Sequence, residues 1–291
     1  RGKIKLNGNK YEYYHDFENY LLIGTDATGN NKNGADYQGS MADFLMLVII
    51  DKTENTYSFL QLNRDTMTEV ALIDHNGEGE ATANIQLCTA HWYGGNREQS
   101  CENTVKSVKK LLGGIQIDGY YELNMSEIPK LNNMVDGVTV TLEDDFSKKY
   151  PKMKKGATIN LDDEQAYAYV HDRYGVGNEE NTSRMKRQQQ YMTGFFKKLQ
   201  EKVKANPNYA NEVFESLQDV STTDITIGKI SNISNIFASG TDKGIFELAG
   251  KSKIGQALGD EIDHMEFYVN KKAMVSTMSE LFGIVEQKNK E

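Results

Sequence analysis

Two acidic residues lie beside apolar runs that are typical of strands, and they are candidates for holding a hard cation. Asp26 closely follows the run Tyr20–Ile23, and Asp43 opens the continuous apolar stretch Phe44–Ile50. In open α/β sheets, ligands bind outside the carboxyl ends of strands. Two converging carboxylates repel each other unless a cation lies between them, and Mg²⁺ usually binds one or two carboxylates together with phosphate oxygens. Taken alone, Asp26 is better explained as a turn residue and Asp43 as a solubilising charge.

Several arginines stand out in a chain whose net charge is −9. Arg64 ends the next predicted strand, and Arg173, Arg184 and Arg187 come much later. Arg184 and Arg187 are three residues apart and share a helix face, near the start of a long predicted helix, where free N–H groups favour anions. Arginine suits phosphate because its planar fork donates two parallel hydrogen bonds. The alternative is that these are surface arginines paired with acids such as Asp172.

Composition excludes several classes of protein. The chain has 291 residues, enough to bury a sizeable core, and 10% of them are aromatic, so we expect it to fold. Its 33 basic and 42 acidic side chains argue against a general nucleic-acid-binding protein, which would carry a basic face. No apolar run is long enough to span a membrane, and the first residues do not resemble a signal peptide.

The apolar pattern predicts strands that alternate with helices. The predicted strands are Tyr20–Ile23, Phe44–Ile50, Tyr57–Leu62, Tyr120–Leu123, Val138–Leu142 and Met265–Val269. The predicted helices are Glu102–Leu112, Ser126–Met134, Asp162–Val170, Arg184–Val203 and Lys271–Phe282. The second and third strands are joined by a short polar turn, which predicts a hairpin. Alternating strands and helices favour an α/β sandwich with a central mixed sheet.

The two cysteines, Cys88 and Cys101, flank the turn-like segment Trp92–Gly95. Two cysteines in so long a chain do not make a disulfide scaffold, and they lack the paired spacing of a typical zinc site. They are either two buried thiols or one disulfide that closes a short loop, which would fit an oxidising compartment. The residues alone leave both open.

Five of these segments, in this order, resemble the motifs of the LytR-CpsA-Psr family. They are Leu22–Asp26, Ala42–Leu47, Asn63–Thr66, Glu164–Arg173 and Arg184–Gln190, and the resemblance spans roughly residues 17 to 200. Five ordered motifs are far more specific than any one of them. The stretches Asn63–Met67 and Ser100–Val105 also resemble a divergent branch of the family found in anaerobic Gram-positive bacteria.

The resemblance implies a fold and a location. The fold would be a three-layer α/β/α sandwich with a central mixed β-sheet and a hydrophobic pocket for a lipid. A single catalytic domain would cover residues 17–291, with the motif-bearing core at 17–200 and an integral C-terminal part at 201–291. Residues 1–16 would be an N-terminal extension after a membrane anchor that precedes this sequence. The domain would then lie at the extracellular face of the cell membrane.

The resemblance also implies an activity: transfer of a glycopolymer from a polyprenyl-pyrophosphate carrier to a peptidoglycan hydroxyl, with pyrophosphatase activity as a further possibility. Asp26 and Asp43 would hold Mg²⁺. The residues expected to bind the pyrophosphate are Arg64, His171, Arg173, Arg184, Arg187 and Gln188. The residues expected to be catalytic are Asp43, Arg64, Asp65 and Arg173, where Asp65 either deprotonates the acceptor or braces Arg64. An extracellular location also favours a disulfide between Cys88 and Cys101.

The sequence departs from the family pattern at three positions, where Met41 and His171 replace arginines and Asn181 replaces an aspartate. These changes motivate an alternative, a polyprenyl-phosphate-binding regulator of envelope biogenesis with weakened turnover. A third possibility is an extracellular adhesin or scaffold, which would show neither lipid binding nor turnover. Apolar residues of the long helix, such as Phe195 and Phe196, either line a lipid pocket or belong to a filled core.

Overall fold

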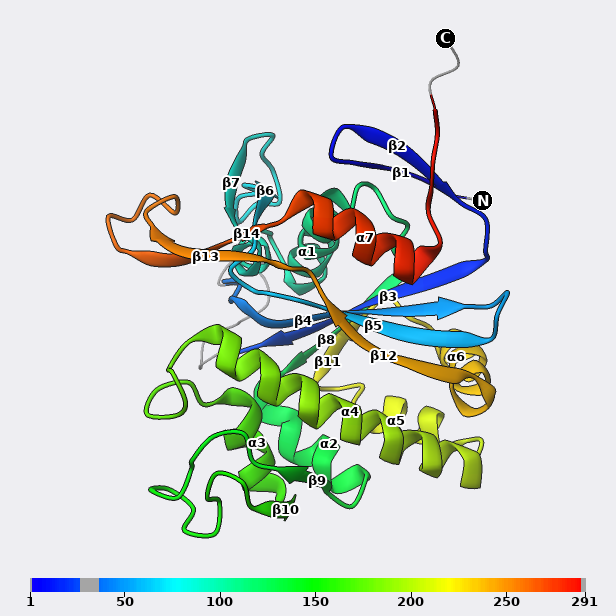
Figure 1. Ribbon diagram of the computed structural model, residues 1–291, viewed down its shortest axis with the longest axis vertical. Coiled ribbons are helices and arrows are strands. Elements are labelled where there is room, and N and C mark those ends of the chain that lie inside the picture. Colours follow the sequence, from blue (N-terminus) through cyan, green and yellow to red (C-terminus); the bar gives the residue numbers. More distant parts are fainter. Residues whose placement is uncertain (1, 27–36, 289–291) are drawn as a thin grey trace. The chain divides into compact units, whose positions relative to one another are not determined.

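The computed structural model describes residues 2–26 and 37–288, which form two compact units (Figure 1). Among the described residues, the sheet unit comprises 2–26, 37–123, 221–225 and 240–288, and the helical unit comprises 124–220 and 226–239. Within the described residues, no helix has the length and apolar character needed to cross a membrane.

The sheet unit is built on a six-stranded mixed sheet, in the order β11-β8-β3-β4-β5-β12. These strands are β3 (Phe17–Thr25), β4 (Ala42–Asp51), β5 (Thr56–Leu62), β8 (Gly119–Asn124), β11 (Ser221–Thr223) and β12 (Thr241–Glu247). β4 is antiparallel to both β3 and β5, whereas β12 is parallel to β5. The expected α/β fold with a central mixed sheet, and the expected hairpin of its second and third strands, are therefore confirmed.

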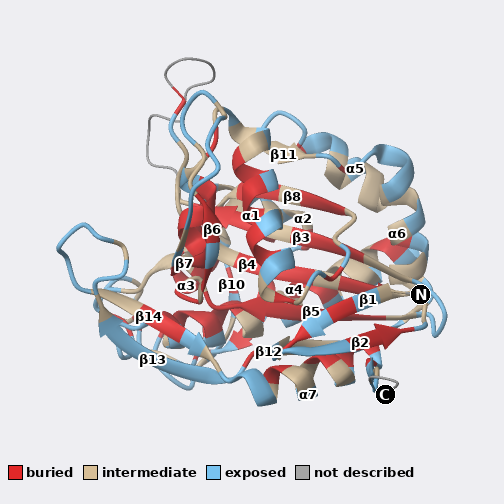
Figure 2. Ribbon diagram, turned by 90° about the horizontal axis from the view of Figure 1, so that it is seen from above, coloured by how far each residue is buried: buried red, intermediate tan, exposed pale blue. Residues whose placement is uncertain are grey.

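Two helices, α1 (Arg97–Leu111) and α7 (Lys271–Phe282), lie on the same face of this sheet (Figure 1). Their apolar sides bury Val108 and Met278 in one core with Leu21 of β3 and Leu47 of β4. The central strands are buried almost throughout, as Figure 2 shows in red. Burial on both faces explains why β4 contains a continuous apolar run, Phe44–Ile50, rather than an alternating pattern.

The first residues form a hairpin of β1 (Gly2–Leu6) and β2 (Asn9–Tyr13), which is extended by β15 (Val285–Glu286). Its two-residue turn, Asn7-Gly8, has φ angles of 49° and 83°, and both residue types tolerate this left-handed region. Ile4 and Tyr11 are buried in the same core as α7. Residues 2–13, which belong to the segment expected to be an extension, thus pack in the sheet unit.

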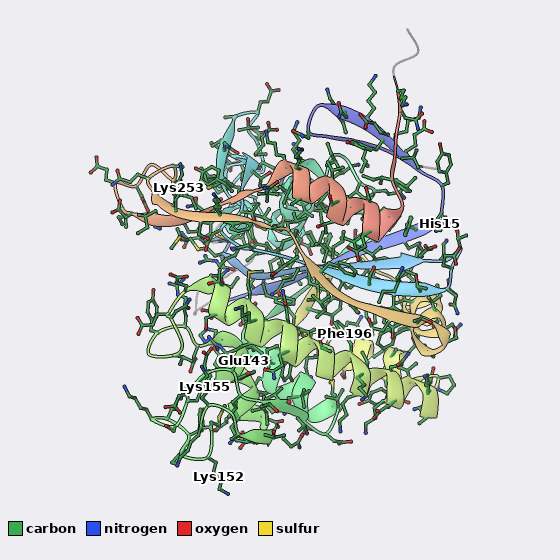
Figure 3. All side chains as sticks on the ribbon, viewed as in Figure 1. His15, Glu143, Lys152, Lys155, Phe196 and Lys253 are labelled. Carbon is green, nitrogen blue, oxygen red and sulfur yellow. The ribbon has the colours of Figure 1, made fainter. Side chains whose placement is uncertain are left out.

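Two more hairpins complete the sheet unit. The first consists of β6 (Met67–Ala71) and β7 (Thr82–Gln86) and is followed by the short 3₁₀ helix η2 (Leu87–Trp92). The second consists of β13 (Gly250–Gly255) and β14 (His264–Val269). β13 is exposed along most of its length (Figure 2), and Lys253 extends from it over the ring of Tyr268 (Figure 3).

The helical unit contains six helices and two short strands among its described residues. They are η3 (Met125–Glu127), α2 (Ile128–Met134), β9 (Val138–Thr141), β10 (Thr158–Leu161), α3 (Asp163–His171), α4 (Asn181–Ala205), α5 (Tyr209–Ser216) and α6 (Ile227–Ser239). The first turn of α3 is fixed by a capping box between Asp162 and Gln165. Three aromatic residues of α4 are buried: Tyr191, Phe195 and Phe196. Figure 3 labels Phe196.

Candidate functional site

Three neighbouring strand ends of the sheet unit bring the first motifs together. Because β4 is antiparallel to β3 and β5, its start lies beside the ends of both: Gly24 pairs with Phe44, and Leu45 pairs with Leu62. The register then shifts, because Thr25 pairs with Ala42, so Asp43 is the extra residue of a β-bulge. Bulges re-aim side chains and are common next to active sites.

Arg64 and Asp43 form an ion pair at this end of the sheet. The Arg64 Nε lies 3.0 Å from Asp43 Oδ1, and each side chain is 12% exposed. The Nε atom is buried, and it makes no hydrogen bond to the described residues. Contacts between a guanidinium and a carboxylate are among the strong charge-assisted interactions, so the pair holds both side chains at this strand end.

The other side of the Arg64 guanidinium faces sulfur. Its Nη2 lies 2.6 Å from Met41 Sδ and 3.2 Å from Cys88 Sγ. Burial alone would lower the pKa of Arg64, but Cys88, Asp43 and Asp65 outweigh it and raise that pKa. Burial also raises the pKa of the Cys88 thiol to about 12, so this thiol is neutral at physiological pH. Sulfur is a weak acceptor, so a phosphate oxygen would be a stronger partner for Nη2.

Asp65 follows Arg64 and is held by the backbone around it. Its N–H donates to Asn63 Oδ1 at 2.9 Å, and its carbonyl accepts from the N–H of Phe267 at 2.8 Å. The carboxylate is nearly buried, and its Oδ1 lies 3.8 Å from Arg64 Nη1. This geometry favours the second of the two roles expected for Asp65, bracing Arg64.

Asp26 and Asp43 are suited to Mg²⁺ because both offer carboxylate oxygens and both lie at the ends of neighbouring strands. Asp26 directly follows the end of β3, and Asp43 is the bulged residue of the neighbouring strand. Asp26 is half-buried, and the Asp43 side chain is 12% exposed. In the described part of the chain, no group of three potential ligands that includes either of them closes around one point. Two carboxylates, with the remaining positions filled by phosphate oxygens and water, are what Mg²⁺ typically uses.

In the helical unit, side chains of α4 hold the C-terminal end of α3. Arg187 donates to the carbonyl oxygens of Tyr169 at 2.5 Å and Asp172 at 2.6 Å. Gln188 donates to the carbonyl of Val170 at 3.0 Å, and Arg184 reaches the carbonyl of His171 at 3.4 Å. The last carbonyls of a helix lack partners within it and carry the negative end of its dipole, so these donors satisfy them.

Arg187 is the most deeply buried of these residues, with no exposed side chain. Its Nε lies 3.0 Å from Asp144 Oδ2, and its guanidinium stacks 5.2 Å from the centre of the Phe146 ring. Burial lowers the pKa of Arg187 although the negative charge of Asp144 opposes this. The expected contact of Arg187 with pyrophosphate stays a prediction, whereas its contacts within the unit support a positioning role.

The C-terminal end of α3, which Arg184, Arg187 and Gln188 hold, carries the remaining motif residues. His171 ends α3, stacks on Tyr167 at 4.7 Å, and its Nδ1 lies 3.2 Å from Asp172 Oδ1. Burial tends to raise the pKa of Asp172, but His171 and Lys149 outweigh it and lower that pKa. Arg173 follows in a loop, where its guanidinium lies 4.8 Å from the centre of an exposed tyrosine ring. Arg173 is half-buried, whereas Arg184 and Arg187 are buried.

The expected disulfide is wrong, because Cys88 and Cys101 are free buried thiols in this structure. Cys88 faces Arg64 from η2, whereas Cys101 on α1 donates to Glu122 Oε2 at 2.7 Å. Sequence reasoning missed Glu122 and its neighbour His91, which lie 21 and 10 residues from Cys101 along the chain. No short motif spacing marks them, so only the three-dimensional fold reveals the group.

A sequence profile of the LytR_cpsA_psr family matches residues 2–282, so the chain belongs to this family. A polyisoprenyl-teichoic acid–peptidoglycan teichoic acid transferase, TagU from Bacillus cereus (strain AH820), is 29% identical over 178 residues, or 61% of this chain and 51% of that protein. The chain thus matches about half the length of the curated relatives.

Solved structures share the fold. The crystal structure of gbs0355 from Streptococcus agalactiae has a TM-score of 0.72 at 21% identity, covering 94% of this chain and 90% of that one. The structure of TagT bound to LI-WTA has a TM-score of 0.66 at 21% identity, covering 92% of this chain and 91% of that one. At this identity the likeness establishes the fold alone.

Proposed function

We propose that this chain is a glycopolymer transferase of the cell envelope, which moves a glycopolymer from a polyprenyl-pyrophosphate carrier to peptidoglycan. The observation that carries the proposal is the Arg64–Asp43 pair at a bulged strand end, in a chain of this family. The relatives it matches are named as transferases of polyisoprenyl-linked teichoic acid to peptidoglycan, and TagT is described as bound to LI-WTA.

In the proposed reaction, a hydroxyl oxygen of peptidoglycan attacks the phosphorus that carries the glycopolymer. The bond from this phosphorus to the bridging oxygen breaks, and polyprenyl phosphate leaves. Negative charge grows on the phosphoryl and leaving oxygens, and the Arg64 guanidinium would stabilise it by donating hydrogen bonds to them. Asp26 and Asp43 would hold Mg²⁺, which when bound neutralises charge on phosphate oxygens.

The acceptor proton needs a base, and Asp65 is the candidate that the family resemblance supplies. Its carboxylate is nearly buried and lies 3.8 Å from Arg64 Nη1, which supports bracing of Arg64 as its principal role. In the helical unit, we assign phosphate contacts to Arg173 and His171. Arg184, Arg187 and Gln188 would act through them, by fixing the end of α3. We call these three positioning residues.

The same proposal places the enzyme at the outer face of the membrane, held by an anchor, where its carrier lipid and peptidoglycan both lie. The polyprenyl chain requires an apolar pocket, because a long hydrocarbon is otherwise exposed to water. Pyrophosphatase activity would follow if water replaces the acceptor hydroxyl.

The test is transfer of a labelled glycan from a polyprenyl-pyrophosphate carrier to peptidoglycan fragments, with and without Mg²⁺. Asp43→Asn and Arg64→Ala should each lower the rate by about 10²-fold or more, because each removes charge stabilisation of the transition state. Asp242→Asn is the matched control, since Asp242 is exposed and bonds only its own turn in the described contacts. Equal rates for wild type and Asp43→Asn would refute the assignment.

The alternative, a lipid-binding regulator without turnover, is favoured by one observation. Met41 stands where the family has an arginine, and its sulfur occupies a position next to Arg64 Nη2. One positive charge is thereby missing from the site. Tight binding of polyprenyl phosphate without transfer, under Mg²⁺ or Mn²⁺, would support the regulator.

A further inference from the structure

A second group of reactive side chains lies inside the sheet unit, apart from the residues assigned above. His91 comes from η2, Cys101 from α1 and Glu122 from β8. They are 0%, 0% and 8% exposed. The His91 nitrogen, the Cys101 sulfur and a Glu122 oxygen lie within 4.8 Å of one another. Three elements far apart in the sequence thus deliver a nitrogen, a sulfur and an oxygen to one buried point.

The hydrogen bonds of this trio fix its protons. His91 Nδ1 lies 2.9 Å from the carbonyl oxygen of Ser40, which can only accept, so Nδ1 carries a proton. His91 Nε2 lies 2.6 Å from Glu122 Oε2, so these two atoms share one proton. The Cys101 thiol donates a second proton to the same oxygen at 2.7 Å. The centre of the trio therefore contains two protons.

With these two protons in place, the buried trio carries no net charge. A divalent cation that displaces both protons leaves an imidazole, a carboxylate and a thiolate, and the sum is again zero. The exchange adds no net charge to the interior, where an uncompensated charge is costly.

The geometry is close to that of a tetrahedral metal centre. Ligands about 2.0–2.3 Å from a zinc ion are roughly 3.5 Å from one another. Cys101 Sγ already lies 3.9 Å from His91 Nε2. The two contacts to Glu122 are shorter because protons bridge them, and they would open by about 1 Å around a metal. The Nδ1–H bond to the Ser40 carbonyl is the outer contact that metal-bound histidines usually make, and it leaves Nε2 to bind.

We propose that His91, Cys101 and Glu122 form a binding site for Zn²⁺ or a similarly soft divalent metal. Zinc accepts mixed nitrogen, sulfur and oxygen ligands, whereas Mg²⁺ and Ca²⁺ take oxygen ligands. Three protein ligands leave one coordination position for a water molecule. The site is distinct in residues and in chemistry from the proposed Mg²⁺ position at Asp26 and Asp43.

The metal would tie η2 to α1 and β8, and η2 in turn supports Arg64. The N–H of Cys88, on η2, donates to the carbonyl of Arg64 at 2.9 Å, and its sulfur lies 3.2 Å from Arg64 Nη2. The role of the site would therefore be structural, holding in place the segment that packs against Arg64.

The test is cobalt titration of the full chain, after metal removal by a chelator. The wild type should bind one equivalent of Co²⁺ with a thiolate-to-cobalt absorption band in the near ultraviolet, and Zn²⁺ should displace it. Cys101→Ser should lose this band. Cys88→Ser is the matched control, because Cys88 is equally buried but lies outside the trio, and it should keep the band. A pH indicator should record close to two protons released per metal bound.

The wild-type titration decides the matter even if a variant fails to fold. A wild type without a thiolate band at one equivalent overturns the proposal, and the trio is then a hydrogen-bonded network alone. A band that survives in Cys101→Ser and disappears in Cys88→Ser also overturns it. These readouts do not depend on transferase activity, so the zinc site and the proposed function stand or fall separately.

Discussion

Replacing Arg187 by methionine tests the positioning role that the structure gives to the Arg184–Gln188 motif. Methionine fills a similar volume but removes the donors to the carbonyls of Tyr169 and Asp172. A buried acceptor that loses its partner costs about 1–3 kcal/mol. Asp144 also loses the charge 3.0 Å away, and it keeps the hydrogen bond from Ser183 Oγ.

The expected loss of unfolding free energy is about 3–5 kcal/mol, the range observed when one partner of a buried pair is removed. The assay is urea unfolding, followed by circular dichroism, with the slope compared between variants. Lys186→Met is the matched control, because Lys186 is the exposed neighbour on the same helix, and it should stay within about 0.5 kcal/mol of the wild type.

A double variant separates the charge from the hydrogen bonds. Asp144→Asn added to Arg187→Met should cost less than the sum of the two single changes, because no charge is then stranded. A loss below about 1 kcal/mol for Arg187→Met would refute the reasoning. It would mean that the guanidinium is not needed to hold α3, and a direct role with the ligand would become the better explanation.

Three further predictions rest on single residues. Asp162→Ala should lower the unfolding free energy by about 1 kcal/mol in urea, because it removes the N-cap of α3. Because the pKa of Asp172 is lowered in the folded state, its carboxylate contributes fully to stability above the pKa of the unfolded chain, about 3.9. This contribution is lost as the pH falls through the pKa of the folded state. The urea midpoint of Asp172→Asn should therefore fall less on acidification than that of the wild type, and an unchanged pH profile would contradict this. Arg64→Lys should transfer glycan more slowly than the wild type but faster than Arg64→Ala, because lysine keeps the positive charge but lacks the planar, forked guanidinium. A wild-type rate for Arg64→Lys in the transfer assay would show that the shape of the guanidinium does not matter.

The elements that were predicted well are those whose own residues determine them. β4 contains a continuous apolar run and β5 is mostly apolar, and they form the expected hairpin. α7 has the predicted bounds, Lys271–Phe282, with Asn270 as its cap. β12 (Thr241–Glu247) was missed, because most of its residues are polar and none of them is fully buried. Its partner strand, β5, also lies far away in the sequence. Long-range pairing of that kind leaves little trace in local sequence.

The site was predicted in part for the same reason. Ordered motifs identified Asp43 and Arg64, and their places at adjoining strand ends follow from the strand order. The partners of Arg184 and Arg187 were not predictable, because helix-face spacing does not reveal which carbonyl groups face that helix. The thiols show the same limit: the extracellular setting favoured a disulfide, but Cys88 faces Arg64 and Cys101 faces Glu122.

The central claim, that this chain breaks a polyprenyl pyrophosphate to transfer a glycopolymer, is tested most directly by the identity of the lipid product. Mass spectrometry should detect polyprenyl monophosphate in equal amount to the glycan phosphodiester formed on the peptidoglycan acceptor. Asp43→Asn should form neither, and Asp242→Asn should form both. An intact polyprenyl pyrophosphate carrier after prolonged incubation of the wild type with acceptor and Mg²⁺ would contradict the account.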